Sequence, residues 1–257
     1  MSGGAEDDGD RGSTWARRVR ELQDAVQRHP GKAAEGTLRS IERIRLIQRA
    51  NFEQLADVLN APDHSPDLVG ELFQNTREPT VREAYQQVFA TAFHNYIASV
   101  RTLVDHTRAV VRRVERPAFV AEYERRLGPV RESSCAAFMA RFRNYVIHYR
   151  FPRFVQEVHL QLLDRDPEEP VLRMLLSRDH LLEWDGWSAG AKAYLRDQPE
   201  QFDIREPLQE YDDLITALYD DWFFPAFWAA HREDIAGVGA LIKEYNTVVG
   251  GGPETFH

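Results

Sequence analysis

The sequence predicts a mainly α-helical protein, an antiparallel helical bundle with one small β-hairpin inserted among its helices. Three observations predict this fold class. Apolar residues recur every three or four positions through most of the 257-residue chain, proline or glycine separates successive helical patterns, and one stretch after residue 153 alternates apolar and polar residues. The chain is 43% hydrophobic, which is enough for a substantial buried core.

The helices predicted before residue 115 are amphipathic. They cover residues 15–29, 37–60, 66–75 and 79–114. Thr14 precedes the first helix, Pro30-Gly31 stops it, and Ser65-Pro66 starts the third. The fourth has no internal helix breaker, so it is expected to be a long central helix.

Proline also delimits the later elements. Helices are predicted at 117–127 and 130–150, and Pro152 ends the second because the residue before a proline disfavours the α conformation. From Phe154 the period becomes two. The segments "FVQEVHLQLL" and "VLRMLLSRDHLLEW", joined by the polar turn "DRDPEEP", therefore predict a β-hairpin at about 154–183.

Helices resume after the hairpin, over about residues 188–246. Ser188 is expected to cap the first of them, and a capping box from Asp203 to Glu206 to begin a long helix that Pro225 kinks.

These elements predict one helical domain at 14–249. An acidic, disordered tail is expected at 1–13 and a frayed tail at 250–257.

The cysteine count and the hydropathy indicate the cellular compartment in which the protein is expected. Cys135 is the only cysteine, which excludes an intrachain disulfide and favours a reducing, cytoplasmic compartment. No stretch approaches the roughly 18 consecutive apolar residues of a membrane span. No membrane association is expected.

The net charge of −9 is distributed unevenly along the chain. Residues 101–153 hold 12 basic side chains, all arginine, and 5 acidic ones, whereas residues 154–257 hold 8 basic and 21 acidic ones. The planar fork of arginine suits phosphate. The alternative is that these arginines pair with the acidic C-terminal third across the bundle.

The segment "RFRNYVIHYR", residues 141–150, places polar side chains on an otherwise apolar helix. At about 100° per residue one broad face is expected to form core: Cys135, Phe138, Met139, Phe142, Tyr145, Val146 and Tyr149. The opposite, narrow strip consists of Ala136, Ala140 and Ile147. Arg143 flanks this strip on one edge, and Asn144 and His148, four residues apart, flank it on the other. Such a strip suits contact with a twofold-related copy or with another helix of the same chain, and the polar groups could equally form a satisfied structural network.

Arg143-Asn144, followed by three residues and His148, resembles the signature of the HEPN superfamily, in which an arginine, a short spacer and a histidine mark the active helix. The segment "AYQQVFATAFHNYIASVRTLVDHTR" is similar to the family's long first helix, and the resemblance is best over about 80–150. Several members place a tyrosine two positions after the histidine, whereas Tyr149 follows His148 directly. The hairpin and the C-terminal helices are additions to a minimal HEPN bundle.

The resemblance implies a metal-independent endoribonuclease without a cofactor, acting in toxin-antitoxin or defence systems, whose site forms where two copies meet in a homodimer. His148 would exchange the proton of the attacking ribose 2′-hydroxyl, since the unperturbed pKa of histidine is about 6.5. Arg143 would hold the phosphate, and Asn144 would orient the imidazole or bind the phosphate. Further contacts to RNA are expected from Arg141, Tyr149, Arg150 and Arg153. An antitoxin is an expected partner.

Two other functions compete with the nuclease. A non-catalytic HEPN-like module would use the same helix for protein assembly or for RNA or nucleotide binding. A metalloenzyme is disfavoured, because the nine histidines form neither His-Glu-x-x-His nor a pair of Glu-x-x-His motifs.

Overall fold

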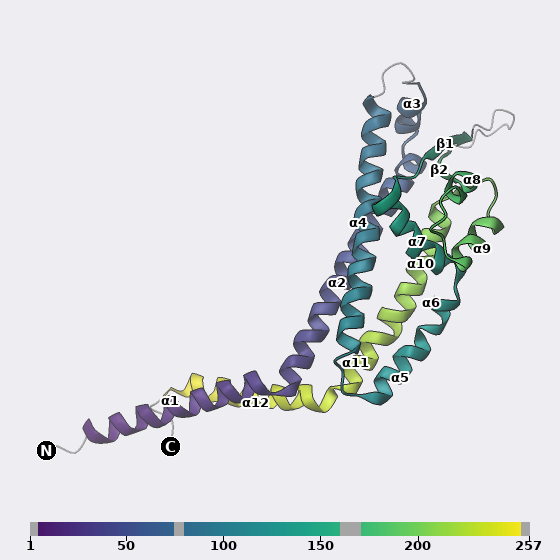
Figure 1. Cartoon of the computed structure of the whole chain (residues 1–257). Coiled ribbons are helices and arrows are strands. Elements are labelled where there is room, and N and C mark those ends of the chain that lie inside the picture. The colour runs from purple at the N-terminus through teal and green to yellow at the C-terminus, as the bar shows by residue number, and fades with distance from the viewer. Residues whose placement is uncertain (1–4, 75–79, 160–170, 253–257) are drawn as a thin grey trace. The chain divides into compact units, whose positions relative to one another are not determined.

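The computed structural model describes residues 5–74, 80–159 and 171–252 (Figure 1). The protein is mainly helical with a small three-stranded antiparallel sheet, so the predicted fold class is confirmed at that level. The chain divides into two compact units, where the sequence predicted one domain at 14–249. We call residues 1–42 with 224–257 the terminal unit, and residues 43–223 the central unit.

The terminal unit joins the two ends of the chain. It contains α1 (Ala5–Arg28), the start of α2 (Pro30–Asn60), α11 (Phe224–Ala230) and α12 (Arg232–Gly251). The indole Nε1 of Trp15 donates to the carbonyl oxygen of Val248 at 3.0 Å, and Arg18 pairs with Glu244 at 2.5 Å. Contacts between α1 and α12 therefore hold the unit together across more than 200 residues of sequence.

Both predicted tails differ from the structure in their described parts. Helix α1 begins at Ala5, nine residues before Thr14, and α12 continues to Gly251. Residues 1–4 and 253–257 lie outside the described residues, so the tail predictions remain predictions there. The break at Pro30-Gly31 is confirmed, since α1 ends at Arg28 and α2 begins at Pro30, a favoured residue for a first helical position.

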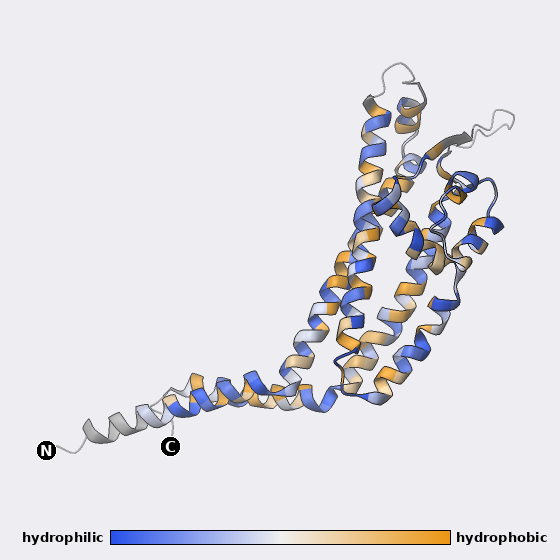
Figure 2. Cartoon of the chain, in the orientation of Figure 1, coloured by the Kyte–Doolittle hydropathy of each residue, from blue (hydrophilic) through white to orange (hydrophobic). Residues whose placement is uncertain are grey.

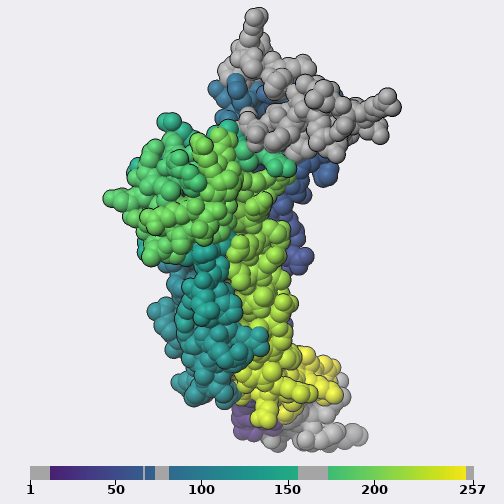
Figure 3. Space-filling view, turned by 90° about the vertical axis from the view of Figure 1, so that its right-hand side faces the viewer, coloured from purple at the N-terminus to yellow at the C-terminus, as the bar shows by residue number. Residues whose placement is uncertain are grey.

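The central unit is a bundle built around α4. Besides the rest of α2, it contains α3 (Pro66–Gln74), α4 (Thr80–Val111), α5 (Pro117–Arg126), α6 (Gly128–Glu132), α7 (Ser134–Asn144), α8 (Arg178–Leu182), α9 (Ala189–Asp197) and α10 (Arg205–Leu218). A 3₁₀ turn, η1 (Ala61–His64), and two π-helical turns, η2 (Tyr145–Tyr149) and η3 (Tyr219–Phe223), complete its helical segments. Helix α10 runs beside α5 (Figure 1, Figure 3).

Aromatic side chains form much of this core. Phe93 from α4 and Phe138 and Phe142 from α7 are fully buried, and their rings lie within stacking distance of one another: 5.3 Å between the centroids of Phe93 and Phe142, and 5.0 Å between those of Phe138 and Phe142. Burying such a side chain contributes about 1.5–3 kcal/mol. Apolar residues accordingly form stripes along the helices (Figure 2).

The sheet has the order β1-β2-β3 and is antiparallel throughout. Strands β1 (Phe154–His159) and β2 (Val171–Ser177) confirm the predicted pair, with Phe154 opposite Leu176, while the predicted turn falls on residues outside the described ranges. Strand β3 (Gln201–Asp203), with Phe202 opposite Leu176, was not predicted.

The predicted second strand is wrong beyond Ser177. The Ser177 hydroxyl accepts a hydrogen bond from the backbone N–H of His180 at 3.4 Å and so begins the short helix α8. Asp179 and His180 therefore lie on a helix and not on a strand.

Two predicted helices are divided in the structure. The helix expected at 130–150 is α6, α7 and η2, because the hydroxyl of Ser133 accepts from the backbone N–H of Ala136 at 3.0 Å and starts a new helix. The long helix expected to begin at the capping box of Asp203 and Glu206 is α10, η3, α11 and α12, with Pro225 just after the π turn.

Of the two predicted caps in this region, one is confirmed and one is wrong. The hydroxyl of Ser188 accepts from the backbone N–H of Ala191 at 3.3 Å and caps α9. The capping box is absent, since the N-cap of α10 is Ile204, and Asp203 instead accepts from the backbone N–H of Arg205 at 2.9 Å.

Candidate anion-binding cavity

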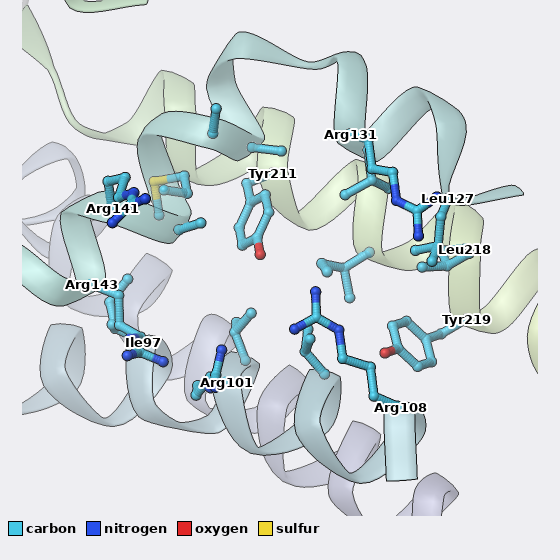
Figure 4. A pocket seen from close by; sticks show the side chains of 18 of the residues that line it. Ile97, Arg101, Arg108, Leu127, Arg131, Arg141, Arg143, Tyr211, Leu218 and Tyr219 are labelled. Carbon is cyan, nitrogen blue, oxygen red and sulfur yellow. The ribbon is translucent and has the colours of Figure 1, made fainter. Parts of the chain in front are cut away.

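A cavity of about 530 Å³ lies in the central unit between α4, α6, α7 and α10 (Figure 4). Five arginines line it: Arg101, Arg108, Arg131, Arg141 and Arg143. Asn144, three tyrosines and aliphatic side chains complete the wall. Cavities of this size hold small ligands in other proteins.

Local helix geometry explains why the arginines meet. Arg101 and Arg108 are seven residues apart on α4, hence on one face and separated by two turns, or about 10.5 Å. Arg141 and Arg143 end α7, where cationic side chains interact favourably with the helix dipole. Arg131 comes from α6. Four of the five are exposed at the rim, and Arg143 is half-buried.

No acidic residue is found among the described residues that line the cavity. Two of the arginines have partners next to it: Arg101 pairs with Asp105, and Arg131 with Glu124 at 2.6 Å. Within the described ranges, the structure gives Arg108, Arg141 and Arg143 no carboxylate partner. The wall is thus an array of cations whose charge is only partly compensated.

Among the described residues, the structure gives the Arg143 guanidinium a single hydrogen-bond acceptor. Its Nη2 donates to Oδ1 of Asn144 at 2.6 Å, while its Nε is buried without a partner in the described structure. Burial lowers the pKa of Arg143, and the positive charge of Arg101 lowers it further. A bound anion would reverse both effects, since it would accept from the guanidinium and neutralise the mutual repulsion.

One tyrosine hydroxyl adds a neutral donor to the cavity. Burial raises the pKa of Tyr211 to about 12, with the charges of Arg108 and Arg143 opposing the rise. Burial also raises the pKa of Tyr219, against the effects of a hydrogen bond with Thr107 and of the charge of Arg108. Both phenols therefore keep their protons at neutral pH, and Figure 4 shows the Tyr211 hydroxyl directed into the cavity.

The structure brings some predicted site residues together and separates others. Arg141, Arg143 and Asn144 line the cavity, whereas His148 is exposed and is not among the lining residues. The cause is the turn η2, in which the backbone N–H of Arg150 donates to the carbonyl oxygen of Tyr145 at 3.0 Å. The α-helical geometry that the sequence analysis assumed ends at Asn144.

The remaining predicted RNA contacts lie beyond this turn. Arg150 donates to the Tyr145 hydroxyl at 2.7 Å and to Glu183 at 2.8 Å, and its guanidinium lies 5.0 Å from the Tyr149 ring centroid. This is the pairing with the acidic C-terminal third that the sequence left open. Arg153 is exposed and lines a second cavity, of about 590 Å³.

The narrow strip on α7 is divided between buried and exposed residues. Ala136 is buried, whereas Ala140 and Ile147 are exposed, and Ala136 and Ala140 line the arginine cavity. A close approach between helices of the same chain lies next to the strip, at Ala137, where a Cβ added at Gly190 of α9 would lie 3.2 Å from the Ala137 Cβ.

Sequence reasoning missed Arg101, Arg108 and Arg131 as site residues, and with them Tyr211 and Tyr219. The signal for the arginines was present in the excess of arginine over residues 101–153. The spacing of seven between Arg101 and Arg108 could have placed both on one helix face. Nothing in the local sequence indicates that two tyrosines of α10 and η3 face them.

Comparison of the chain with protein-family models, curated proteins and solved structures finds no match. In the part of the chain that the structure covers, no helix is long and apolar enough to cross a membrane. The described residues also contain no group of three histidine, cysteine, aspartate or glutamate side chains placed to hold a metal ion.

Proposed function

We propose that the central unit binds single-stranded RNA and that the arginine cavity receives its phosphate. The observation that carries this proposal is a half-buried arginine, Arg143, with a buried and unpartnered Nε in a cavity lined by four more arginines. A site built in this way suits an anion with several acceptor oxygens. Phosphate supplies them in a geometry that matches the guanidinium fork.

The other lining groups favour a nucleotide over a bare phosphate. Tyr211 and Asn144 offer neutral hydrogen-bonding groups, and aliphatic side chains such as Val104 and Ile215 offer an apolar wall. RNA recognition typically combines cations for the phosphates with aromatic and apolar surfaces for unstacked bases. The resemblance of the Arg143-Asn144 segment to the HEPN signature supports the same class of ligand.

Cleavage of the RNA is the second candidate function, and the exposure of His148 favours it. One copy of the chain holds Arg143 and Asn144 at the cavity and His148 on the exposed turn η2. In a homodimer of HEPN type, His148 of a second copy would supply the proton transfer that this cavity lacks. An antitoxin would act by covering the exposed turn.

RNA binding is tested with Arg143→Gln, which keeps a polar side chain at this position but shortens it and removes its charge. Fluorescence anisotropy with a short labelled single strand should show an affinity lower by roughly tenfold to a hundredfold, since a hydrogen bond to a charged group contributes about 1.5–3 kcal/mol. The salt dependence of binding should also become shallower.

The matched control is Arg196→Gln, an exposed arginine on α9 that is not among the lining residues. It should bind RNA like the wild type. Equal affinity of the wild type and Arg143→Gln, with both folded by circular dichroism, would reject the proposed RNA site.

Cleavage is tested separately, with wild type and His148→Ala in the presence of EDTA. The nuclease proposal expects the wild type to produce fragments ending in a cyclic phosphate, and the variant to bind RNA without cutting it. Binding without cleavage by the wild type leaves a non-catalytic RNA-binding module. Equal cleavage by both proteins rules out His148 as the proton-transfer group.

A further inference from the structure

We propose that the cavity holds one nucleotide with a phosphate group at each end. This inference rests on the proposed RNA binding and specifies its ligand: a single RNA residue together with the two phosphates that flank its ribose. The argument comes from the way the cations divide between two ends of the cavity.

The first end is formed by Arg143 and Arg101. The positive charge of Arg101 adds to the lowering of the pKa of Arg143 by burial, and the charge of Asp105, the partner of Arg101, opposes it. Figure 4 shows the side chains of Arg143 and Arg101 at the same end of the cavity, together with Arg141. Asn144 adjoins this end through its hydrogen bond with Arg143.

The second end is formed by Arg108 and Arg131. Burial raises the pKa of Tyr123, and the charges of Arg108 and Arg131 each oppose this rise. Figure 4 shows Arg131 beside Leu127, while Arg108 extends from beside Tyr219 toward the middle of the cavity; both lie away from Arg143. Arg101 and Arg108 mark the two ends along α4, about 10.5 Å apart by helix rise.

The space between the ends suits an uncharged, partly apolar body. Val104 lies between Arg101 and Arg108 on α4, and Met139 and Ile215 contribute to the same wall from α7 and α10. Tyr211 is central, because the charges of both Arg108 and Arg143 act on its hydroxyl. Arg101 and Arg131 each have one carboxylate partner, Asp105 and Glu124, whereas Arg143 and Arg108, at opposite ends, have none among the described residues. A ligand with one anionic group would reach only one of these two ends.

A nucleoside with two phosphates meets each of these requirements. Its base and ribose would occupy the apolar middle, with the Tyr211 hydroxyl available as a donor. Its two phosphates would each accept from one arginine pair. The volume of about 530 Å³ accommodates a ligand of this size, so further residues of an RNA strand would continue outside the cavity.

Isothermal titration calorimetry with adenosine 3′,5′-bisphosphate, adenosine 5′-monophosphate and inorganic phosphate tests the division into two ends. The bisphosphate should bind at least tenfold more tightly than the monophosphate. Arg101→Gln and Arg108→Gln, which change exposed side chains at opposite ends, should each weaken bisphosphate binding roughly tenfold, while only one of them weakens the monophosphate. Arg196→Gln should change neither.

Equal affinity for the bisphosphate and the monophosphate would overturn the inference, as would bisphosphate binding that is insensitive to Arg108→Gln. The proposed function fails differently. If RNA binds through Arg143 and the bisphosphate does not compete with it, the RNA site stands and the single-nucleotide inference is wrong. If the bisphosphate binds at both ends and RNA does not bind, the nucleotide site stands and RNA binding is wrong.

Discussion

Arg45 and Arg143 of the central unit differ in the number of hydrogen-bond acceptors around each guanidinium. This difference distinguishes a structural arginine from a candidate binding residue. Arg45 is 4% exposed, and it donates to Asp220 at 2.6 Å, to Thr216 at 2.8 Å and to Gln48. Arg143 has only Asn144 as a partner in the described structure. Because a buried charge is tolerated when it is paired and hydrogen-bonded, Arg45 is complete within the fold, whereas Arg143 keeps a buried Nε without a partner in the described structure.

The Arg45 network predicts unequal effects of two similar substitutions. Asp220→Asn removes the carboxylate that accepts two guanidinium nitrogens of Arg45, so the free energy of unfolding should fall by about 2–3 kcal/mol. Asp212→Asn should cost less than about 1 kcal/mol, because an asparagine oxygen can still accept from Gln48, which donates to Asp212 at 2.9 Å. Urea unfolding at neutral pH measures both.

The pH dependence of the free energy of unfolding, compared between wild type and Asp212→Asn, provides a further test. Burial raises the pKa of Asp212 above its ordinary value of 3.8, so the folded state holds this proton more tightly than the unfolded state does. The stability that the group contributes is present below 3.8 and is lost as the pH rises through the folded pKa. The difference in unfolding free energy between wild type and Asp212→Asn should therefore change over that interval. A constant difference would contradict the assignment.

The residue types in the sequence predicted only part of the candidate site. The polar residues Arg143, Asn144 and His148 stand out in a hydrophobic helix, and the first two do line a cavity. The separation of His148 from that cavity depends on a backbone hydrogen bond, and the neutral tyrosines come from α10 and η3, about 70 residues later. The residue types alone predict neither the position of His148 outside the cavity nor the presence of the tyrosines in its wall.

At the scale of elements, the helical wheel predicts burial correctly as far as Tyr145 and incorrectly at Tyr149. Phe142 and Tyr145 are fully buried as predicted, but Tyr149, assigned to the same face, is 49% exposed. The difference arises because η2 bonds each N–H one residue further back than an α-helix does. A period of 3.6 therefore places residues incorrectly once the π turn begins.

The missed strand and helix have a related origin. Strand β3 is three residues long and exists because residues 201–203 pair with residues 175–177. Such pairing is nonlocal, so a three-residue segment carries no periodic signal of its own. Helix α8 begins at the Ser177 cap. The apolar residues around Ser177 fit the pattern of a strand, so the sequence analysis did not identify this cap.

Arg150 provides the test at this scale, because it holds η2 against the segment that follows β2. Arg150→Gln should lower the urea midpoint of unfolding, since the side chain donates to the Tyr145 hydroxyl, to Glu183 and to the carbonyl oxygen of His180. Arg153→Gln, an exposed arginine three residues later, should leave the midpoint unchanged.

The Arg150 effect should also depend on pH. The hydrogen bond from Arg150 lowers the pKa of Glu183 below its ordinary value of 4.5. The stabilisation is therefore present above 4.5 and is lost as the pH falls through the folded pKa of Glu183. Equal effects of Arg150→Gln and Arg153→Gln at neutral pH would show that the Arg150 contacts do not stabilise the turn.

At the scale of the whole molecule, helical class was predictable and the division into units was not. Periodicity is a local property, so it identifies helices wherever they later pack. The terminal unit instead depends on contacts such as Trp15 to Val248, which are 233 residues apart. The unit boundary falls inside α2, between residues 42 and 43, and no break in the sequence marks it.

Gly31 predicts how the terminal unit can be perturbed alone. A Cβ at this position would lie 1.9 Å from the carbonyl oxygen of Asp234, a backbone atom at the start of α12. Gly31→Ala should therefore force α2 and α12 apart and destabilise the terminal unit by about 1–3 kcal/mol. Gly36→Ala, on the same helix with nothing within 4 Å of the added Cβ, should instead stabilise the helix by up to about 1 kcal/mol.

Hydrogen exchange measured by mass spectrometry distinguishes a local effect from a global one. In Gly31→Ala, amides of α1 and α12 should lose protection, because Trp15 and Arg18 hold these helices together through contacts near the other end of α12. Amides of α4 and α7, which carry the arginine cavity, should keep theirs, and RNA binding should match that of Gly36→Ala. Loss of protection throughout residues 43–223 would mean that the two units unfold as one, and the cavity would then depend on residues far outside its own wall.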